Sequence, residues 1–317
     1  MNLRELGRSG IRVPTITFGG NVFGWTVDQA TSFSLLDALL DHKLNFIDTA
    51  DVYSAWVPGN FGGESETIIG NWLQKSGKRD QIILATKVGK PMGPQLKGLS
   101  ARYIREAVEA SLRRLKTDYI DLYQAHDDDQ NTPLAQTMNA FDALIKEGKV
   151  RAIGASNYSA ERLAKALDVS AQLGLARYET IQPEYNLYDR HDFEVDLAPL
   201  VQKEGLGVIN YYALASGFLS GKYRSAEDAH KSARGNGIVE KYLNSRGLGI
   251  LDALEQVAHE VNASPVAVAL AWQIAQPGIT SPIASATSLK QLNELAVAAN
   301  LRLSAEQVRV ITDASAY

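Results

Sequence analysis

The sequence predicts an α/β protein of the (β/α)8 TIM-barrel class with a short N-terminal β-hairpin. Three observations lead to this fold class. Short strand-like runs alternate with amphipathic helical stretches, eight such runs occur, and no linker, repeat or composition shift divides the 317 residues. Alternating elements favour βα units around a parallel sheet, and eight units in a chain of this length favour a closed barrel over an open sheet. We therefore expect residues 1–317 to form one domain.

The predicted elements follow one another from the N-terminus. Residues 3–7 and 11–13, joined by Arg8-Ser9-Gly10, have the pattern of a hairpin that closes the barrel floor. The eight strand candidates are residues 15–19, 45–48, 82–86, 120–123, 150–154, 180–182, 207–211 and 282–285. Helical patterns at 32–42, 66–74, 101–115, 133–147, 160–173 and 197–204 precede the second to seventh strands. Another helix begins at Ser264-Pro265, since proline at the first helical position after a capping serine is a start signal.

The least regular stretch is predicted at residues 213–247. It is rich in glycine and carries several lysines and arginines. Because it follows the seventh strand, we expect it to lie over the mouth of the barrel.

Composition excludes several classes of protein. The chain has no cysteine, which rules out disulfides, thiolate metal sites, iron–sulfur clusters and a cysteine nucleophile. The net charge of −4 gives no broad basic field for nucleic acid. The N-terminus lacks the apolar core of a signal peptide, and the longest apolar run is too short to cross a bilayer. We expect a cytoplasmic protein that does not bind membranes.

Polar residues recur where the predicted strands end. The strand-end residues are Asp48, Lys87, His126, Ser156, Asn157, Gln182, Tyr211 and Ser285, and Tyr53 follows Asp48 by five positions. The active site of this fold is built at the carboxyl ends of the strands, so these groups are predicted to converge.

Four of these residues form an acid–base set. Tyr53 holds a proton at neutral pH and can donate it to a developing alkoxide. A lysine cation, Lys87, is expected to stabilise the phenolate and lower its pKa, and Asp48 supplies the carboxylate that a buried lysine needs. His126 can donate to the carbonyl oxygen and orient it. The set suits reduction of a C=O group by an external hydride, which no side chain can supply.

Five ordered motifs resemble the signatures of the aldo-keto reductases. They are Phe46-Ile47-Asp48-Thr49-Ala50-Asp51-Val52-Tyr53, Ala85-Thr86-Lys87, Leu122-Tyr123-Gln124-Ala125-His126, residues 149–157 and residues 217–223. The resemblance implies a barrel that binds NADP(H), less often NAD(H), and no metal, with Asp48, Tyr53, Lys87 and His126 as its catalytic tetrad. It also implies reversible reduction of small aldehydes or ketones to alcohols.

The resemblance assigns cofactor residues position by position. Ser156, Asn157 and Gln182 match the contacts to the nicotinamide carboxamide, and Tyr211 matches the ring that stacks on the nicotinamide. A pyrophosphate loop is implied at Leu214, Ser216, Gly217, Leu219, Gly221 and Lys222, and an adenosine site at Ser285, Thr287, Gln291 and Glu294. Small residues suit a loop whose backbone N–H groups approach a diphosphate.

Two departures from the family pattern concern the cofactor. The family usually has Ser-Pro-Leu after the stacking aromatic, whereas this chain has Tyr212-Ala213-Leu214. Thr287 stands where the family commonly has a basic residue that binds the 2′-phosphate. Leu295 stands where the family commonly has an asparagine that contacts the adenine. NADP(H) is favoured by the resemblance, and NAD(H) is the rival.

Other interpretations remain for single features. Trp25, Trp56 and Phe61 lie in loops after the first two strands and are expected either to wall a substrate pocket or to pack on their own scaffold. His126 with Asp127-Asp128-Asp129 could form a metal cluster, although no second histidine has ligand spacing. The alternative function is a regulatory subunit that binds the cofactor with little turnover; a barrel using flavin or a metal is a third. The oligomeric state is left undetermined, between monomer and homo-oligomer.

Overall fold

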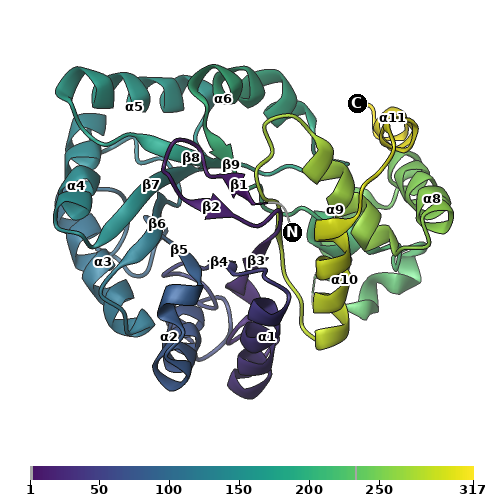
Figure 1. The fold of residues 1–317 in the computed structure, drawn as a ribbon, viewed down its shortest axis with the longest axis horizontal. Coiled ribbons are helices and arrows are strands. Elements are labelled where there is room, and N and C mark those ends of the chain that lie inside the picture. The colour runs from purple at the N-terminus through teal and green to yellow at the C-terminus, as the bar shows by residue number, and fades with distance from the viewer. Residues whose placement is uncertain (1–2, 233) are drawn as a thin grey trace.

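The computed structural model describes residues 3–232 and 234–317 and has a parallel eight-stranded sheet at its centre (Figure 1). The strand order is β10-β3-β4-β5-β6-β7-β8-β9, with every neighbouring pair parallel. The strands are β3 (Thr17–Gly19), β4 (Phe46–Asp48), β5 (Ile83–Val88), β6 (Ile120–Ala125), β7 (Val150–Ser156), β8 (Tyr178–Gln182), β9 (Gly207–Val208) and β10 (Ile283–Ala284). The predicted (β/α)8 class is confirmed.

Hydrogen bonds between the segments around β9 and β10 join the two ends of the sheet. The Ile283 backbone N–H donates to the Asn210 carbonyl at 2.9 Å, and the Thr280 N–H donates to the Val208 carbonyl at 2.9 Å. Strands β9 and β10 are shorter than the predicted ranges 207–211 and 282–285, and these bonds continue the pairing beyond the two strands. The sheet therefore closes, and the carboxyl ends of all strands face one mouth.

Helices surround the sheet and connect its strands (Figure 1). They are α1 (Gln29–Asp41), α2 (Glu64–Ser76), α3 (Ala101–Leu115), α4 (Leu134–Lys146), α5 (Ala160–Leu173), α6 (Ala198–Glu204), α7 (Gly235–Tyr242), α8 (Ser245–Glu260), α9 (Pro265–Ala275), α10 (Leu289–Asn300) and α11 (Ala305–Ala314). The predicted start of α9 is confirmed, because Ser264 caps it by accepting from the Ala267 N–H. Of the helices formed by the described part of the chain, none combines the length and apolar character needed to cross a bilayer.

The segment predicted to be irregular, residues 213–247, contains short helices. They are η4 (Ala215–Ser220), η5 (Ala226–Lys231) and α7. A capping box formed by Ser225 and Asp228 starts η5, a signal that the sequence-based reading of this stretch overlooked. Lys241 of α7 reaches Glu184, which follows β8, at 3.1 Å. This contact ties the segment to the carboxyl ends of the strands, as its predicted position over the mouth requires.

The N-terminal hairpin of β1 (Arg4–Glu5) and β2 (Arg12–Val13) fills the opposite end of the barrel, and the prediction is confirmed. The fully buried side chains of Leu6 and Val13 pack in one cluster with inward-facing barrel residues such as Phe46. Gly7 has φ +62°, and any Cβ there would collide with the Glu179 carbonyl. Glycine therefore lets the hairpin approach the barrel floor.

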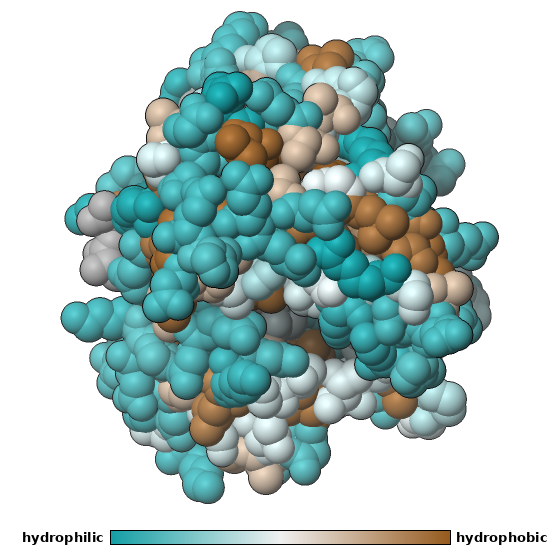
Figure 2. All heavy atoms as spheres, turned by 90° about the vertical axis from the view of Figure 1, so that its right-hand side faces the viewer, coloured by the Kyte–Doolittle hydropathy of each residue, from teal (hydrophilic) through white to brown (hydrophobic). Residues whose placement is uncertain are grey.

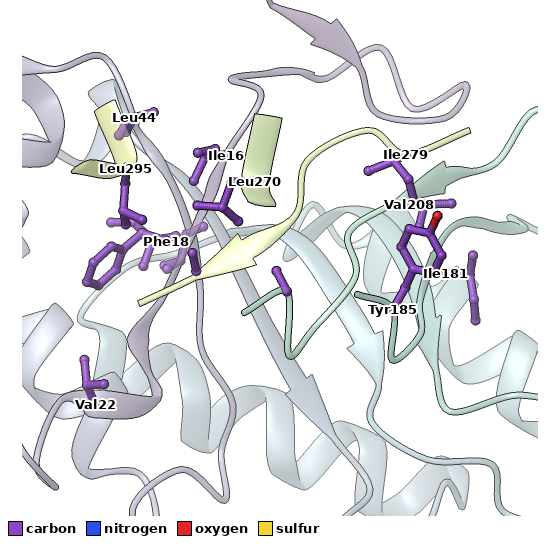
Figure 3. Packing of buried hydrophobic residues seen from close by; sticks show 14 of the residues in the cluster. Ile16, Phe18, Val22, Leu44, Ile181, Tyr185, Val208, Leu270, Ile279 and Leu295 are labelled. Carbon is purple, nitrogen blue, oxygen red and sulfur yellow. The ribbon is translucent and has the colours of Figure 1, made fainter. Parts of the chain in front are cut away.

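A second, larger core lies between the strands and the helices. Figure 3 shows Phe18 of β3 beside Leu295 of α10, while Tyr185, Val208 and Ile279 gather near β9. Leu295 is 2% exposed, so α10 uses this position for packing. The side that carries α8 to α11 is mostly hydrophilic, with separate hydrophobic spots (Figure 2).

Candidate active site

Lys87 is the centre of a buried polar group at the end of β5. Its Nζ donates to Asp48 Oδ2 at 2.6 Å, to the Thr49 carbonyl at 2.8 Å and to the Tyr53 hydroxyl at 2.8 Å. The side chain is 0% exposed. Three acceptors match the three N–H protons of an ammonium, so the charged form is fully hydrogen-bonded. Three of the four predicted tetrad residues are thus in direct contact.

Asp48, at the end of β4, uses its other carboxylate oxygen for two amides. Asp48 Oδ1 accepts from Gln124 Nε2 at 3.1 Å and from Gln182 Nε2 at 3.0 Å. Gln124 was not among the sequence-predicted site residues. Its signal was strand parity, because Gln124 is two positions from both Leu122 and His126 and so shares their face, which points into the barrel.

Burial determines the protonation states of the tetrad. Burial, and then the Asp48 carboxylate, raise the pKa of Tyr53 well above its usual value, while burial lowers the pKa of Lys87. The expectation of a lowered pKa for Tyr53 is therefore wrong in its net direction, because burial and the neighbouring Asp48 carboxylate disfavour the phenolate. The phenol holds its proton throughout the neutral range.

His126 follows β6 and lies beside Tyr53, with the ring centres 6.0 Å apart. Burial lowers the pKa of His126 well below 6.5, and the cations Lys87 and Lys90 lower it further. The imidazole is therefore neutral at pH 7 and carries one N–H for donation. Its Nδ1 has no hydrogen-bond partner among the residues described.

The acidic residues after His126 have partners of their own. Asp128 accepts from Arg162 Nε at 2.8 Å, and Asp129 accepts from the Leu99 N–H at 2.8 Å. Within residues 3–232 and 234–317, no group of three His, Asp or Glu side chains could hold a metal ion. These contacts explain the acidic run as a loop held by hydrogen bonds.

The residues predicted to contact the nicotinamide lie side by side at the ends of β7, β8 and β9. Ser156 Oγ donates to the Gln182 carbonyl at 2.8 Å. Asn157 donates to the His126 carbonyl and to Asp127, and accepts from the Tyr211 hydroxyl at 2.8 Å. The Asn157 amide is therefore engaged within the protein, and it connects the histidine to the aromatic ring predicted to stack.

The predicted pyrophosphate loop has an unusual backbone. Ala215, Ser216, Gly217 and Gly221 all have positive φ values, of 47°, 57°, 102° and 80°. A Cβ on Gly217 would lie 3.7 Å from Lys222 Nζ, so the ammonium lies against the bare backbone. Among the described residues, the Lys222 ammonium has no carboxylate partner and lies 5.2 Å from the ring centre of Tyr223. Closely turned backbone beside an unpaired cation suits a diphosphate.

The predicted adenosine residues lie at the start of α10. The Thr287 N–H and hydroxyl both donate to Gln291 Oε1, at 2.7 and 3.0 Å, and Ser285 Oγ donates to Asn21 Oδ1 at 2.7 Å. Glu294 is half-buried one turn after Gln291. Asn21 was not predicted, because it belongs to the loop after β3 and reaches this site only when the barrel closes.

Two of the three predicted pocket aromatics line the mouth. The rings of Trp25 and Trp56 meet edge to face at 5.5 Å, and Trp56 meets Tyr53 at 6.0 Å. Phe61 is 84% exposed and is not in this aromatic group. Arg234 stacks on Trp25, with 4.8 Å from its guanidinium carbon to the ring centre. Sequence reasoning found no arginine here, because the segment that carries Arg234 meets Trp25 only across the mouth.

Comparison with known proteins gives a consistent result. The model of the aldo/keto reductase family matches residues 15–316. The chain is 34% identical to "Uncharacterized oxidoreductase YrpG" of Bacillus subtilis (strain 168), over 99% of this chain and 95% of that protein. It is 34% identical to "Probable voltage-gated potassium channel subunit beta" of Arabidopsis thaliana, over 93% and 90%. It is 32% identical to "Norsolorinic acid reductase" of Aspergillus flavus, over 98% and 79%.

The fold, the arrangement of side chains at the strand ends and these matches all point to the same protein family. Aldo/keto reductases bind nicotinamide cofactors, usually NADPH, and act on small-molecule carbonyl substrates. The family match and the oxidoreductase relatives support carbonyl reduction in general. The chain belongs to the aldo/keto reductase family.

Proposed function

We propose that the protein is an NAD(P)H-dependent reductase of aldehydes or ketones, with Tyr53 as the proton donor. The observation that carries the proposal is the contact of 2.8 Å between Lys87 Nζ and the Tyr53 hydroxyl, with Asp48 behind the lysine. Tyr53 is half-buried beside the aromatic mouth, where a small carbonyl compound can approach it.

Each tetrad residue has a distinct part in the proposed chemistry. The reduced nicotinamide, when bound, supplies the hydride. Tyr53 donates its proton to the carbonyl oxygen as charge develops there, and the Lys87 ammonium stabilises the phenolate that remains. Asp48 keeps the buried lysine charged. Neutral His126 donates its N–H to the same oxygen and orients it; in the oxidative direction the proton returns to Tyr53.

The residues present fit a dinucleotide, and we assign its parts to them as proposals. Gln182 and its neighbours Ser156 and Asn157 would hold the carboxamide, Tyr211 would stack on the nicotinamide, and Lys222 with the loop from Leu214 to Gly221 would bind the diphosphate. NADP(H) is the proposed cofactor, as is usual in the family. NAD(H) is the rival, because Thr287 and Leu295 occupy the positions of the usual base and asparagine, and Leu295 is buried in the core. Parallel titrations with NADPH and NADH decide between them.

The test is Tyr53→Phe, which removes the proton donor and keeps the ring. We expect kcat for a good aldehyde substrate to fall by about 10²–10⁴ while cofactor affinity stays within twofold. Tyr123→Phe is the matched control. The Tyr123 hydroxyl is also buried, but it has no hydrogen-bond partner among the described residues and Tyr123 is not one of the four tetrad residues. Near wild-type turnover of Tyr53→Phe would show that another group donates the proton.

A second candidate function is a cofactor-binding regulatory subunit. It is supported by the relatives named as potassium channel beta subunits. This function predicts tight cofactor binding with negligible turnover across many carbonyl compounds. Turnover that depends on Tyr53 would exclude it as the only function.

A further inference from the structure

Two buried glutamine side chains lie between Asp48 and the predicted nicotinamide site. Gln124 on β6 is 0% exposed and Gln182 on β8 is 2% exposed. Both donate through Nε2 to Asp48 Oδ1, and Gln182 Nε2 also donates to Gln124 Oε1 at 3.1 Å. The tetrad as proposed above gives Gln124 no part.

The chemistry of Asp48 determines which way both amides face. An ionised carboxylate only accepts hydrogen bonds, so each amide must present its nitrogen to it. The second N–H of Gln182 is held by Gln124 Oε1. Flipping the Gln182 amide would bring its oxygen against two acceptors, one of them charged, which a buried site strongly disfavours.

The fixed amide leaves one polar atom available. Gln182 Oε1 forms no hydrogen bond with any residue in the described part of the chain. The atom is not fully buried, so a ligand can reach it. It can accept a hydrogen bond and cannot donate one. A primary carboxamide offers a matching N–H donor.

We propose that Gln124 is a positioning residue that, together with Asp48, fixes the amide of Gln182 so that its Oε1 accepts from the carboxamide NH₂ of the nicotinamide. The inference rests on the proposed function and adds to it. The same Asp48 that holds Lys87 and Tyr53 then also sets the orientation of the ring that carries the hydride. The positions of the hydride donor and of the proton donor would then both depend on the Asp48 carboxylate.

Binding measurements on Gln124→Met test the inference without turnover. Methionine keeps the length of the side chain and loses both the carbonyl and the NH₂ of the amide. The oxidised cofactor is compared with its 3-acetylpyridine analogue, in which a methyl group replaces the NH₂. We expect the variant to lose about tenfold in affinity for the natural cofactor, or ~1.4 kcal/mol, and less than twofold for the analogue.

The control is Gln273→Met. Gln273 is also 0% exposed and fully hydrogen-bonded, but its partners are Asn210, Ala213 and Ala269. A general loosening of the barrel by removal of a buried amide should affect both dinucleotides equally. Equal losses for both ligands in Gln124→Met, or no loss for either, would overturn the inference and leave the proposed function standing. Failure of the wild-type protein to bind either dinucleotide would overturn both.

Gln124→Glu provides a second test that does not depend on the methionine variant folding. A neutral carboxyl offers one donor to Asp48 and one acceptor to Gln182, as the amide does, whereas an ionised carboxyl repels Asp48. Affinity for the natural cofactor, relative to wild type at the same pH, should therefore recover as pH falls from 8 to 6, while affinity for the analogue changes little. A pH-independent ratio would contradict the proposed role.

Discussion

Removing Lys87 should destabilise the protein more than the loss of one side chain would suggest. Lys87→Met deletes three hydrogen bonds and leaves the Asp48 carboxylate, 1% exposed, without its cation. Breaking a buried ion pair from one side costs roughly 3–5 kcal/mol. Asp48 keeps two amide donors, from Gln124 and Gln182, so we expect the low end, about 3 kcal/mol. Asp48→Asn should cost a similar amount, because it leaves the buried ammonium without a carboxylate.

The double variant Lys87→Met with Asp48→Asn removes both charges together. Since no unpaired charge remains, it should be more stable than the sum of the single changes by about 2 kcal/mol or more. The assay is equilibrium urea unfolding at pH 7, followed by the fluorescence of the four tryptophans. The reasoning is refuted if Lys87→Met unfolds like wild type, or if the two single effects add.

Three further changes test other parts of the structure. Burial and the Glu66 carboxylate raise the pKa of Asp51 to about 8. Folded protein therefore holds a proton that the unfolded chain has lost above pH ~4, and wild type loses up to about 1.4 kcal/mol per pH unit between pH ~4 and 8. Asp51→Asn should gain stability relative to wild type from pH 5 to 8 in urea unfolding; a constant difference would contradict the raised pKa. Gly70→Ala in α2 would press a Cβ on the Arg114 carbonyl and should cost about 1–3 kcal/mol, whereas Gly237→Ala in α7, with open space around it, should be neutral or slightly stabilising. Leu6→Ala at the barrel floor should cost about 2–5 kcal/mol by the same assay, and a smaller loss would mean that the hairpin adds little to the core.

The grouping of the four proposed tetrad residues could be predicted from sequence because its determinants are local. Asp48, Lys87 and His126 end or directly follow strands, and the closing of a parallel barrel brings strand ends together whatever the details of packing. Asn21, Gln124 and Arg234 needed the structure. Their partners lie 264, 76 and 209 positions away in the chain, and only the register of the strands and the course of the loops bring them into contact. The raised pKa of Tyr53 could not be predicted from the sequence either, because the sequence does not give the depth of burial that is its largest cause.

The presence of a buried ion pair between Lys87 and Asp48 is better explained by the proposed chemistry than by the stability of the fold. Replacing a buried ion pair with neutral side chains is often neutral or stabilising, so a barrel of this size does not need the pair to fold. What the pair does provide is an ammonium 2.8 Å from the Tyr53 hydroxyl, where it would stabilise the phenolate that proton transfer leaves behind. The double variant should therefore stay folded while losing carbonyl reduction, and cofactor affinity should hold only as far as the asparagine introduced in place of Asp48 still orients Gln182. If that variant were both folded and active, Tyr53 would not need the cation, and the proposed roles of Lys87 and Asp48 would fall together.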